Sequence, residues 1–130
     1  MSEPILLSMI FADRVIVENN NKKGIIGTFD RFMSSTFPAI FPPWAIYVAV
    51  TNLTGKHNFS ITLTQIETGN IILPINGELE SPNQDQNMEL FFNLAGIAFP
   101  EPGRYSLSVE LNGELLGSRV LFVEQISPAS

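Results

Sequence analysis

Apolar and polar residues alternate along much of this chain with a period of two, the spacing of side chains on a β-strand. The alternation is clearest at residues 58–64 and 104–112. No segment of about ten residues or more has the spacing of an amphipathic helix, so the sequence predicts an all-β fold. Further alternating or apolar segments complete the expected strands: 5–11, 14–18, 25–29, 44–50, 71–75 and 88–94.

Short turn sequences separate these segments. Asn112 and Gly113 form the strongest hairpin signal, because a type I′ turn needs positive φ at both central residues. Pairing through this turn places Val109 opposite Leu116 and Tyr105 opposite Val120. About seven to nine short strands in one domain over residues 1–130 predict an antiparallel two-sheet sandwich.

The segment before the 104–112 strand resembles the entry to a late strand of immunoglobulin-like sandwiches. Its sequence, FPEPGRY at 99–105, ends on Tyr105, which we expect to bond back to the preceding corner through its hydroxyl. The chain has no cysteine, so the disulfide of antibody domains is missing and the resemblance is to an immunoglobulin-like fold only.

Most of the chain resembles a family of small bacterial proteins classed as a domain of unknown function. The matching segments are FADRVIV at 11–17, IIGTFD at 25–30, FPA at 37–39, FPEPGRY at 99–105 and NGELL at 112–116. The resemblance implies one small sandwich domain and a bacterial source. It carries over no catalytic residue.

The composition narrows the classes of partner. The 7 Lys and Arg residues stand against 13 Asp and Glu, and charged residues make up only 15% of the chain, against about 25% in typical soluble domains. Clustered basic residues are missing, which argues against nucleic acid. The apolar stretch at 5–12 is too short to span a membrane and no basic residue precedes it, so we expect a cytoplasmic protein with no membrane partner.

Catalytic signals are weak. The single histidine, His57, is expected in an exposed loop between two strands. Neither a Gly-x-Ser-x-Gly elbow nor a phosphate-binding glycine loop occurs, and the aspartates are too scattered for a calcium loop. We therefore expect a protein that is not an enzyme and that needs no metal and no cofactor.

A repeated Asp-Arg dipeptide provides candidate structural residues. If the strands on either side of residues 19–24 pair so that facing positions sum to 44, Asp13 faces Arg31 and Arg14 faces Asp30. The two ion pairs would then define the strand register. Alternatively, the four charges form a recognition patch.

The most distinctive segment runs from Phe37 to Trp44 and contains Pro38, Pro42 and Pro43. Proline cannot donate a backbone hydrogen bond, so this segment is expected to cross over or cover an edge. Its rings either close the open end of the domain or form a rigid apolar surface for a partner. The candidate partner-binding residues here are Phe37, Phe41, Pro42, Pro43 and Trp44.

The last strand contains two further candidates, Leu121 and Val123. In the register expected from the Asn112–Gly113 turn they point away from the core. Either a bulge near Gly117 rotates them inward, or another chain covers them.

Together these features predict a non-catalytic binding or assembly module whose partner is an unknown protein or a second copy of the chain. The alternative is a small sugar-binding or hydrolytic sandwich that uses loop carboxylates and aromatic rings. A sugar site should have an exposed ring, such as Trp44, flanked by Asn, Asp or Gln side chains. An assembly module should instead present a flat apolar patch.

Overall fold

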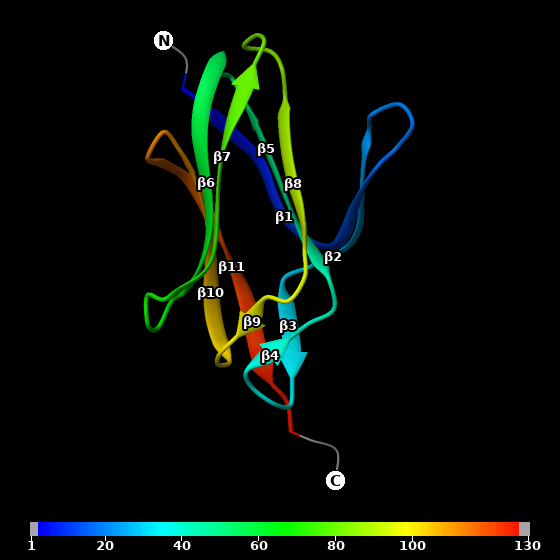
Figure 1. Ribbon diagram of the computed structural model, residues 1–130, viewed down its shortest axis with the longest axis vertical. Helices are drawn as coiled ribbons and strands as arrows, with labels where there is room; N and C mark the ends of the chain where they lie inside the picture. Colours follow the sequence, from blue (N-terminus) through cyan, green and yellow to red (C-terminus); the bar gives the residue numbers. More distant parts are fainter. Residues whose placement is uncertain (1–2, 128–130) are drawn as a thin grey trace.

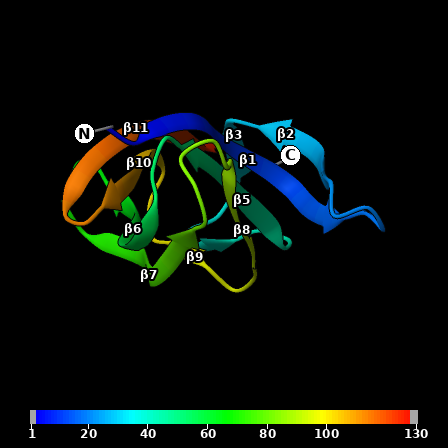
Figure 2. The ribbon, with the colours of Figure 1, turned by 90° about the horizontal axis from the view of Figure 1, so that it is seen from above.

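The computed structural model describes residues 3–127 and consists of two β-sheets packed face to face (Figures 1 and 2). One sheet has four strands in the order β2-β1-β5-β8, and the other has five in the order β3-β11-β10-β6-β7. The strands are β1 (Ile5–Val17), β2 (Lys23–Phe29), β3 (Arg31–Ser34), β4 (Ala39–Ile40), β5 (Trp44–Thr51), β6 (Gly55–Gln65), β7 (Ile71–Ser81), β8 (Met88–Leu94), β9 (Ala98–Phe99), β10 (Gly103–Leu111) and β11 (Glu114–Gln125).

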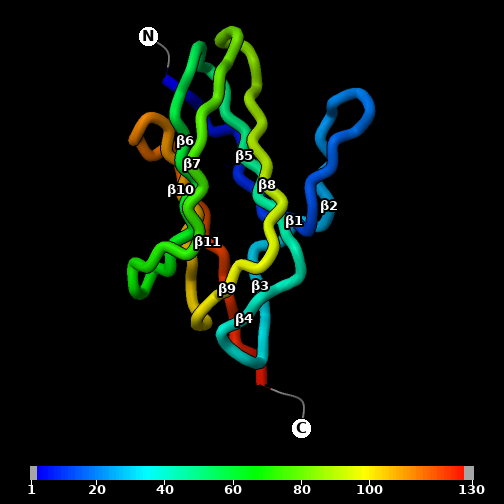
Figure 3. The backbone as a smooth tube through the Cα atoms, viewed as in Figure 1, coloured from blue at the N-terminus to red at the C-terminus, as the bar shows by residue number. Residues whose placement is uncertain are grey.

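The all-β sandwich predicted from the sequence is confirmed, with eleven strands where about seven to nine were expected. Two of the additional strands, β4 and β9, are two-residue segments that pair only with each other. All sheet pairings are antiparallel except that of β3 with β11, which is parallel. The tube in Figure 3 shows how the chain leaves β2 and enters β3 in the other sheet.

Side-chain alternation places the core between the sheets. Phe59, Ile61 and Leu63 of β6 are buried, while the residues between them are only half-buried. Strand β10 shows the same pattern from Tyr105 to Leu111. Strand β5 is buried along nearly its whole length, because one of its faces packs in the main core and the other in a second apolar cluster.

A β-bulge in β11 determines which residues of the last strand face the core. Glu110 still pairs with Leu115, as the turn predicts, but Val109 pairs with Gly117, so the strand contains one additional residue. Because neighbouring side chains on a strand point to opposite faces, this residue reverses the faces of all later positions. Leu121 therefore lies opposite Tyr105 and is fully buried, together with Val123.

The expected pairing of the two Asp-Arg dipeptides was wrong. Strand β1 pairs with β2 so that Phe11 faces Phe29, a register four residues away from the predicted one. Asp30 lies at the bend after β2, and Arg31 begins β3 in the opposite sheet. Because the chain changes sheets at this bend, Arg31 and Asp13 are not cross-strand neighbours.

Arg31 has other partners. Its guanidinium group lies 2.5 Å from Glu124 Oε1 and 3.4 Å from Asp30 Oδ1, and it covers the ring of Phe122 at 5.3 Å. The contacts join β3 to β11 on the surface. Asp13 instead places its carboxylate against the backbone of Gly27.

Arg119 connects the two sheets at the part of β1 that is not paired with β2. That pairing starts at Phe11, so Met9 has β5 on one side and lacks a β2 partner on the other. The Arg119 Nη1 group of β11 donates a hydrogen bond to the Met9 carbonyl at 2.7 Å, and its guanidinium lies 5.4 Å from the ring centre of Phe11. One side chain thus satisfies a backbone acceptor of the opposite sheet and covers a core ring.

We expect Arg119→Ala to lower the free energy of unfolding by about 2 to 3 kcal/mol, because it removes a charged hydrogen bond and a cation–π contact. Urea denaturation measures this loss. The matched control is Arg104→Ala, whose exposed ion pair with Glu67 spans 3.8 Å and should contribute less than about 1 kcal/mol. Equal losses in the two variants would contradict the assigned role of Arg119.

Gly27 and Gly69 allow a second matched comparison, since both have positive φ, +71° and +76°. A Cβ atom on Gly27 would lie 2.2 Å from Asp13 Oδ2, whereas a Cβ on Gly69 would meet open space. We expect Gly69→Ala to cost about 1 to 2 kcal/mol through φ alone, and Gly27→Ala to cost about 1 kcal/mol more. Thermal melts of both variants, and of Gly27→Ala combined with Asp13→Ala, measure the difference. An excess that persists unchanged without the Asp13 carboxylate would contradict the contact.

Candidate functional site

The proline-rich segment closes one end of the sandwich with a cluster of aromatic rings. Phe41 stacks on Phe32 with ring centres 4.1 Å apart and an interplanar angle of 7°. Trp44 meets the edge of Phe32 at 5.5 Å. Phe99 lies between Phe41 and Tyr105, at 5.6 Å and 5.0 Å. The cluster joins residues of both sheets to the connecting segments.

Three of the seven candidate partner-binding residues are buried. Trp44, Leu121 and Val123 are exposed by only 2%, 0% and 2% and belong to the main core. The bulge in β11 accounts for Leu121 and Val123, and the aromatic cluster accounts for Trp44. These side chains therefore present no surface to a partner in this fold.

The remaining four candidates lie on what we call the proline cap, residues 37–43. Phe37 and Phe41 are half-buried and pack against the core, while Pro42 and Pro43 are exposed. Ile40 lies between Phe37 and Phe41 in the chain. Its side chain is 64% exposed, more than any other large apolar side chain of residues 3–127. The cap thus has a buried aromatic side and an outward side of proline and isoleucine.

Tyr105 makes the corner contact expected from the sequence. Its Oη donates a hydrogen bond to the Glu101 carbonyl at 2.5 Å and accepts one from the Glu101 N–H at 3.4 Å. Burial raises the pKa of the Tyr105 phenol, which keeps it protonated as a donor. This tyrosine therefore closes the corner between β9 and β10 and has a structural role.

The sequence placed His57 in an exposed loop, whereas the structure places it half-buried in β6. Its Nε2 lies 2.8 Å from the Thr54 carbonyl, and its Nδ1 accepts a hydrogen bond from Asn112 Nδ2 at 2.8 Å. Asn112 also accepts a bond from the Asn58 N–H at 2.9 Å. Both ring nitrogens thus help to hold the turn at Asn112 and Gly113, whose φ angles are +50° and +84°.

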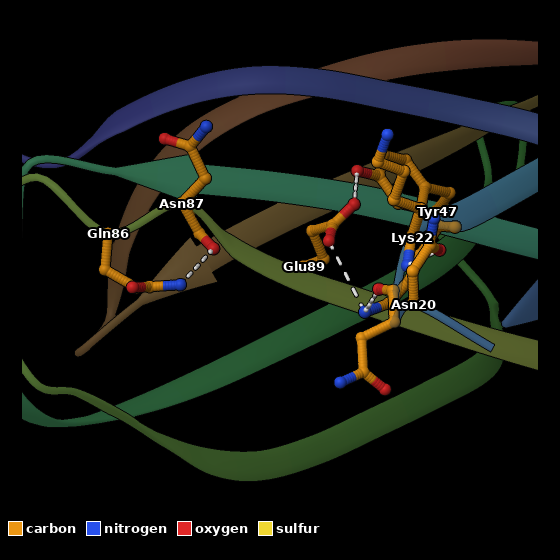
Figure 4. Close-up of polar contacts among 8 residues, drawn as sticks. Asn20, Lys22, Tyr47, Gln86, Asn87 and Glu89 are labelled. Carbon is orange, nitrogen blue, oxygen red and sulfur yellow. Dashed lines mark hydrogen bonds and ion pairs between the residues drawn. The ribbon is translucent and has the colours of Figure 1, made fainter. Parts of the chain in front are cut away.

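A polar cluster that the sequence reading missed lies on the outer face of the four-stranded sheet. The Tyr47 hydroxyl of β5 donates a hydrogen bond to Glu89 Oε2 of β8, and Figure 4 shows the two side chains pointing toward each other. Lys23 Nζ of β2 lies 3.5 Å from Glu89 Oε1. A single carboxylate in the apolar strand at 88–94 was the one local signal of this cluster.

An apolar cluster adjoins these polar groups. Val15, Ala45, Tyr47 and Ala49 are buried there, and Ile10, Ile25 and Phe91 pack against them. Val15 and Ile25 pair with each other in the β1–β2 hairpin, which projects beside β8 in Figure 1. The hairpin therefore covers part of a sheet face that the second sheet does not reach.

The Tyr47–Glu89 contact determines the chemistry of this face. Burial, the hydrogen bond to Glu89 and the charge of that carboxylate, in this order, raise the pKa of Tyr47 from 10.0 to about 12. The phenol is therefore neutral near pH 7 and acts as a donor to Glu89, not as a base. Within residues 3–127, no three His, Asp or Glu side chains gather in a metal-binding group.

The raised pKa of Tyr47 predicts a loss of stability at high pH. The folded protein retains the phenol proton more strongly than the unfolded chain. The contribution of the neutral Tyr47 phenol to the free energy of unfolding is therefore complete below pH 10, and it falls as the pH rises to about 12. A shift of this size corresponds to about 3 kcal/mol at most. We expect the stability difference between the native protein and Tyr47→Phe to shrink over this range.

Denaturation curves at intervals between pH 8 and pH 12 test this expectation. Tyr105 is present in both proteins, so its own titration contributes equally to both curves. A difference between the two proteins that stays constant up to pH 12 would contradict the raised pKa of Tyr47.

Three comparisons place the chain among known proteins. A β-glucosidase from Listeria innocua, solved in complex with isofagomine, aligns with 98% of this chain at 10% identity and a TM-score of 0.48. The aligned part is only 17% of the glucosidase chain, and this likeness supports no functional conclusion. No curated protein matches, and none of the described residues forms a helix long and apolar enough to cross a membrane. The family model described as "Family of unknown function (DUF6941)" matches residues 7–124, so the chain belongs to this family.

Proposed function

We propose that this protein is a non-catalytic binding or assembly module that uses the outward side of the proline cap. The observation that carries the proposal is Ile40, which is 64% exposed on a segment whose aromatic residues anchor it to the core. Exposed apolar groups on a fixed backbone are typical of surfaces that bind protein partners.

The rigidity of the proline cap supports this assignment. Pro38, Pro42 and Pro43 restrict the backbone, and the Phe41–Phe32 stack fixes the segment from inside. A segment that is already ordered loses little conformational entropy when a partner binds. The outward side of the cap therefore has its binding conformation already in the unbound protein.

The engagement of the polar groups supports a non-catalytic role. His57 uses both ring nitrogens in the turn contacts, and Tyr47 donates to Glu89, which also faces Lys23. The sugar-binding alternative required an exposed ring such as Trp44, and this ring is buried. We therefore propose a protein partner or a second copy of the chain, and neither nucleic acid nor a membrane.

We further infer that the sandwich is of the immunoglobulin type. Strands β10 and β11 pair with each other and β10 pairs with β6, as strands F, G and C do in that fold. Strands β5 and β8 pair in the opposite sheet, as B and E do, and Tyr105 lies near the start of the F-like strand, where it bonds back to the corner. A bacterial source and a cytoplasmic location remain predictions from the sequence.

The substitution Ile40→Ser tests the proposed surface. It should reduce binding about tenfold or more if Ile40 is a central anchor, while leaving the fold intact because the side chain is exposed. Binding is measured as self-association by analytical ultracentrifugation and as retention of a defined set of proteins from the native host.

The matched control is Leu115→Ser, which removes a side chain of similar apolar character that is 60% exposed and lies in β11 near the Asn112–Gly113 turn. Thermal melts should show that both variants keep the native stability to within about 1 kcal/mol. Equal binding by the native protein and Ile40→Ser would refute the proposed surface, as would equal losses in both variants.

A further inference from the structure

The hairpin formed by β1 and β2 extends past the point where β1 stops pairing with β5. Strand β1 pairs with β5 only as far as Ala12, opposite Ala45, whereas its pairing with β2 continues to Val17, opposite Lys23. We call residues 13–27 the β1–β2 arm. Figure 1 shows the arm projecting to the side of β8, with its turn away from the body of the sandwich.

Side-chain contacts hold the arm against the outer face of β5 and β8. Val15 of the arm is buried together with Ala45, Tyr47 and Ala49, and Ile25 packs against them. Lys23 of the arm faces Glu89 at 3.5 Å. The arm therefore covers the apolar cluster from outside through side-chain contacts, although it is not paired with β5 or β8 as a strand.

Asn93 makes the contact that most resembles strand pairing. Its Oδ1 accepts a hydrogen bond from the Val15 N–H at 3.3 Å, and its Nδ2 donates to the Val15 carbonyl at 3.5 Å. One side-chain amide thus serves both backbone groups of the residue that lies past the end of the β1–β5 pairing. Both bonds are long, and Asn93 itself is exposed, so water can replace them when the arm opens.

A glycine with positive φ lies at the base of the arm. The β1–β2 pairing runs through Ala12–Thr28 and Arg14–Ile26, and Gly27 between them has a φ of +71°. Rotation at this point would break the contacts with Asn93 and Glu89 while every backbone hydrogen bond of the arm itself stays in place.

We propose that the β1–β2 arm is a flap, which Asn93 and Glu89 hold closed and whose opening exposes the face formed by Ala45, Tyr47 and Ala49. This inference uses a different surface from the proline cap and is independent of the function proposed for it. Opening requires no unfolding of the core, because the residues involved lie outside the main core cluster.

The absence of cysteine from the chain makes the flap directly testable. The variants Ala45→Cys and Ala49→Cys each place one thiol under the arm, where the native side chains are 0% and 5% exposed. Val48→Cys places a thiol at a position that is also 0% exposed but faces the main core. Reaction of each thiol with a soluble disulfide reagent, under native conditions, measures how often each position becomes accessible.

We expect both thiols under the arm to react at least about tenfold faster than the thiol of Val48→Cys, since local opening precedes global unfolding. Adding Asn93→Ala should accelerate them about tenfold more through loss of the hydrogen bonds, without accelerating the core thiol. The control Glu67→Gln, which removes a surface carboxylate in contact with Arg104, should change neither rate.

A covalent closure provides the opposite test. A carbodiimide couples the Lys23 amine to the Glu89 carboxylate as an amide, and the carbodiimide itself is converted to a urea by the water lost in this step. The product is identified by peptide mass. The joined protein should label at Ala45→Cys as slowly as at Val48→Cys. The flap is refuted if Ala45→Cys and Val48→Cys react equally fast in the protein without the amide. It is also refuted if the amide leaves the reaction rate at Ala45→Cys unchanged. Agreement between the Ala45 and Ala49 probes excludes a thiol that wedges the arm open.

Discussion

The packing of aromatic rings at one end of the sandwich is the interaction on which the rest of the fold depends. Phe29 of β2 lies 4.7 Å from Phe32 of β3, so consecutive strands that belong to opposite sheets meet through their rings. Phe32 in turn contacts Trp44 of β5 and Phe99. The crossing of the chain between sheets, the position of the proline cap and the closure of the core are therefore consequences of one cluster.

The period-two pattern predicted the inward faces of β6 and β10 because both strands are regular over their whole length. It could not predict the orientation of Leu121, since one additional residue in β11 reverses every later position and the sequence offers both outcomes. The predicted Asp13–Arg31 contact failed for a related reason. The pattern does not reveal that the chain bends at Asp30 and enters the other sheet.

The proline cap and the outer face of β5 and β8 differ in how far the sequence could reveal them. The proline cap is continuous in the chain, and its proline and aromatic content is visible by inspection. The outer face of β5 and β8 joins Tyr47 to Glu89 over 42 positions, and Val15 to Asn93 over 78. Such contacts depend on strand order, which composition and spacing do not determine. For Trp44 the sequence left two roles open, and its burial agrees with the one in which its ring closes the end of the domain.

The parallel pairing of β3 with β11 has a consequence for how the chain folds. Arg31 and Glu124 meet although 93 positions separate them, so the end of the five-stranded sheet forms only when the last strand is in place. Until then β3 has no strand partner and Phe32 lacks its neighbour Val123. Long-range pairing of this kind slows folding. During synthesis, β3 therefore stays without its partner until the chain has grown by about 90 further residues.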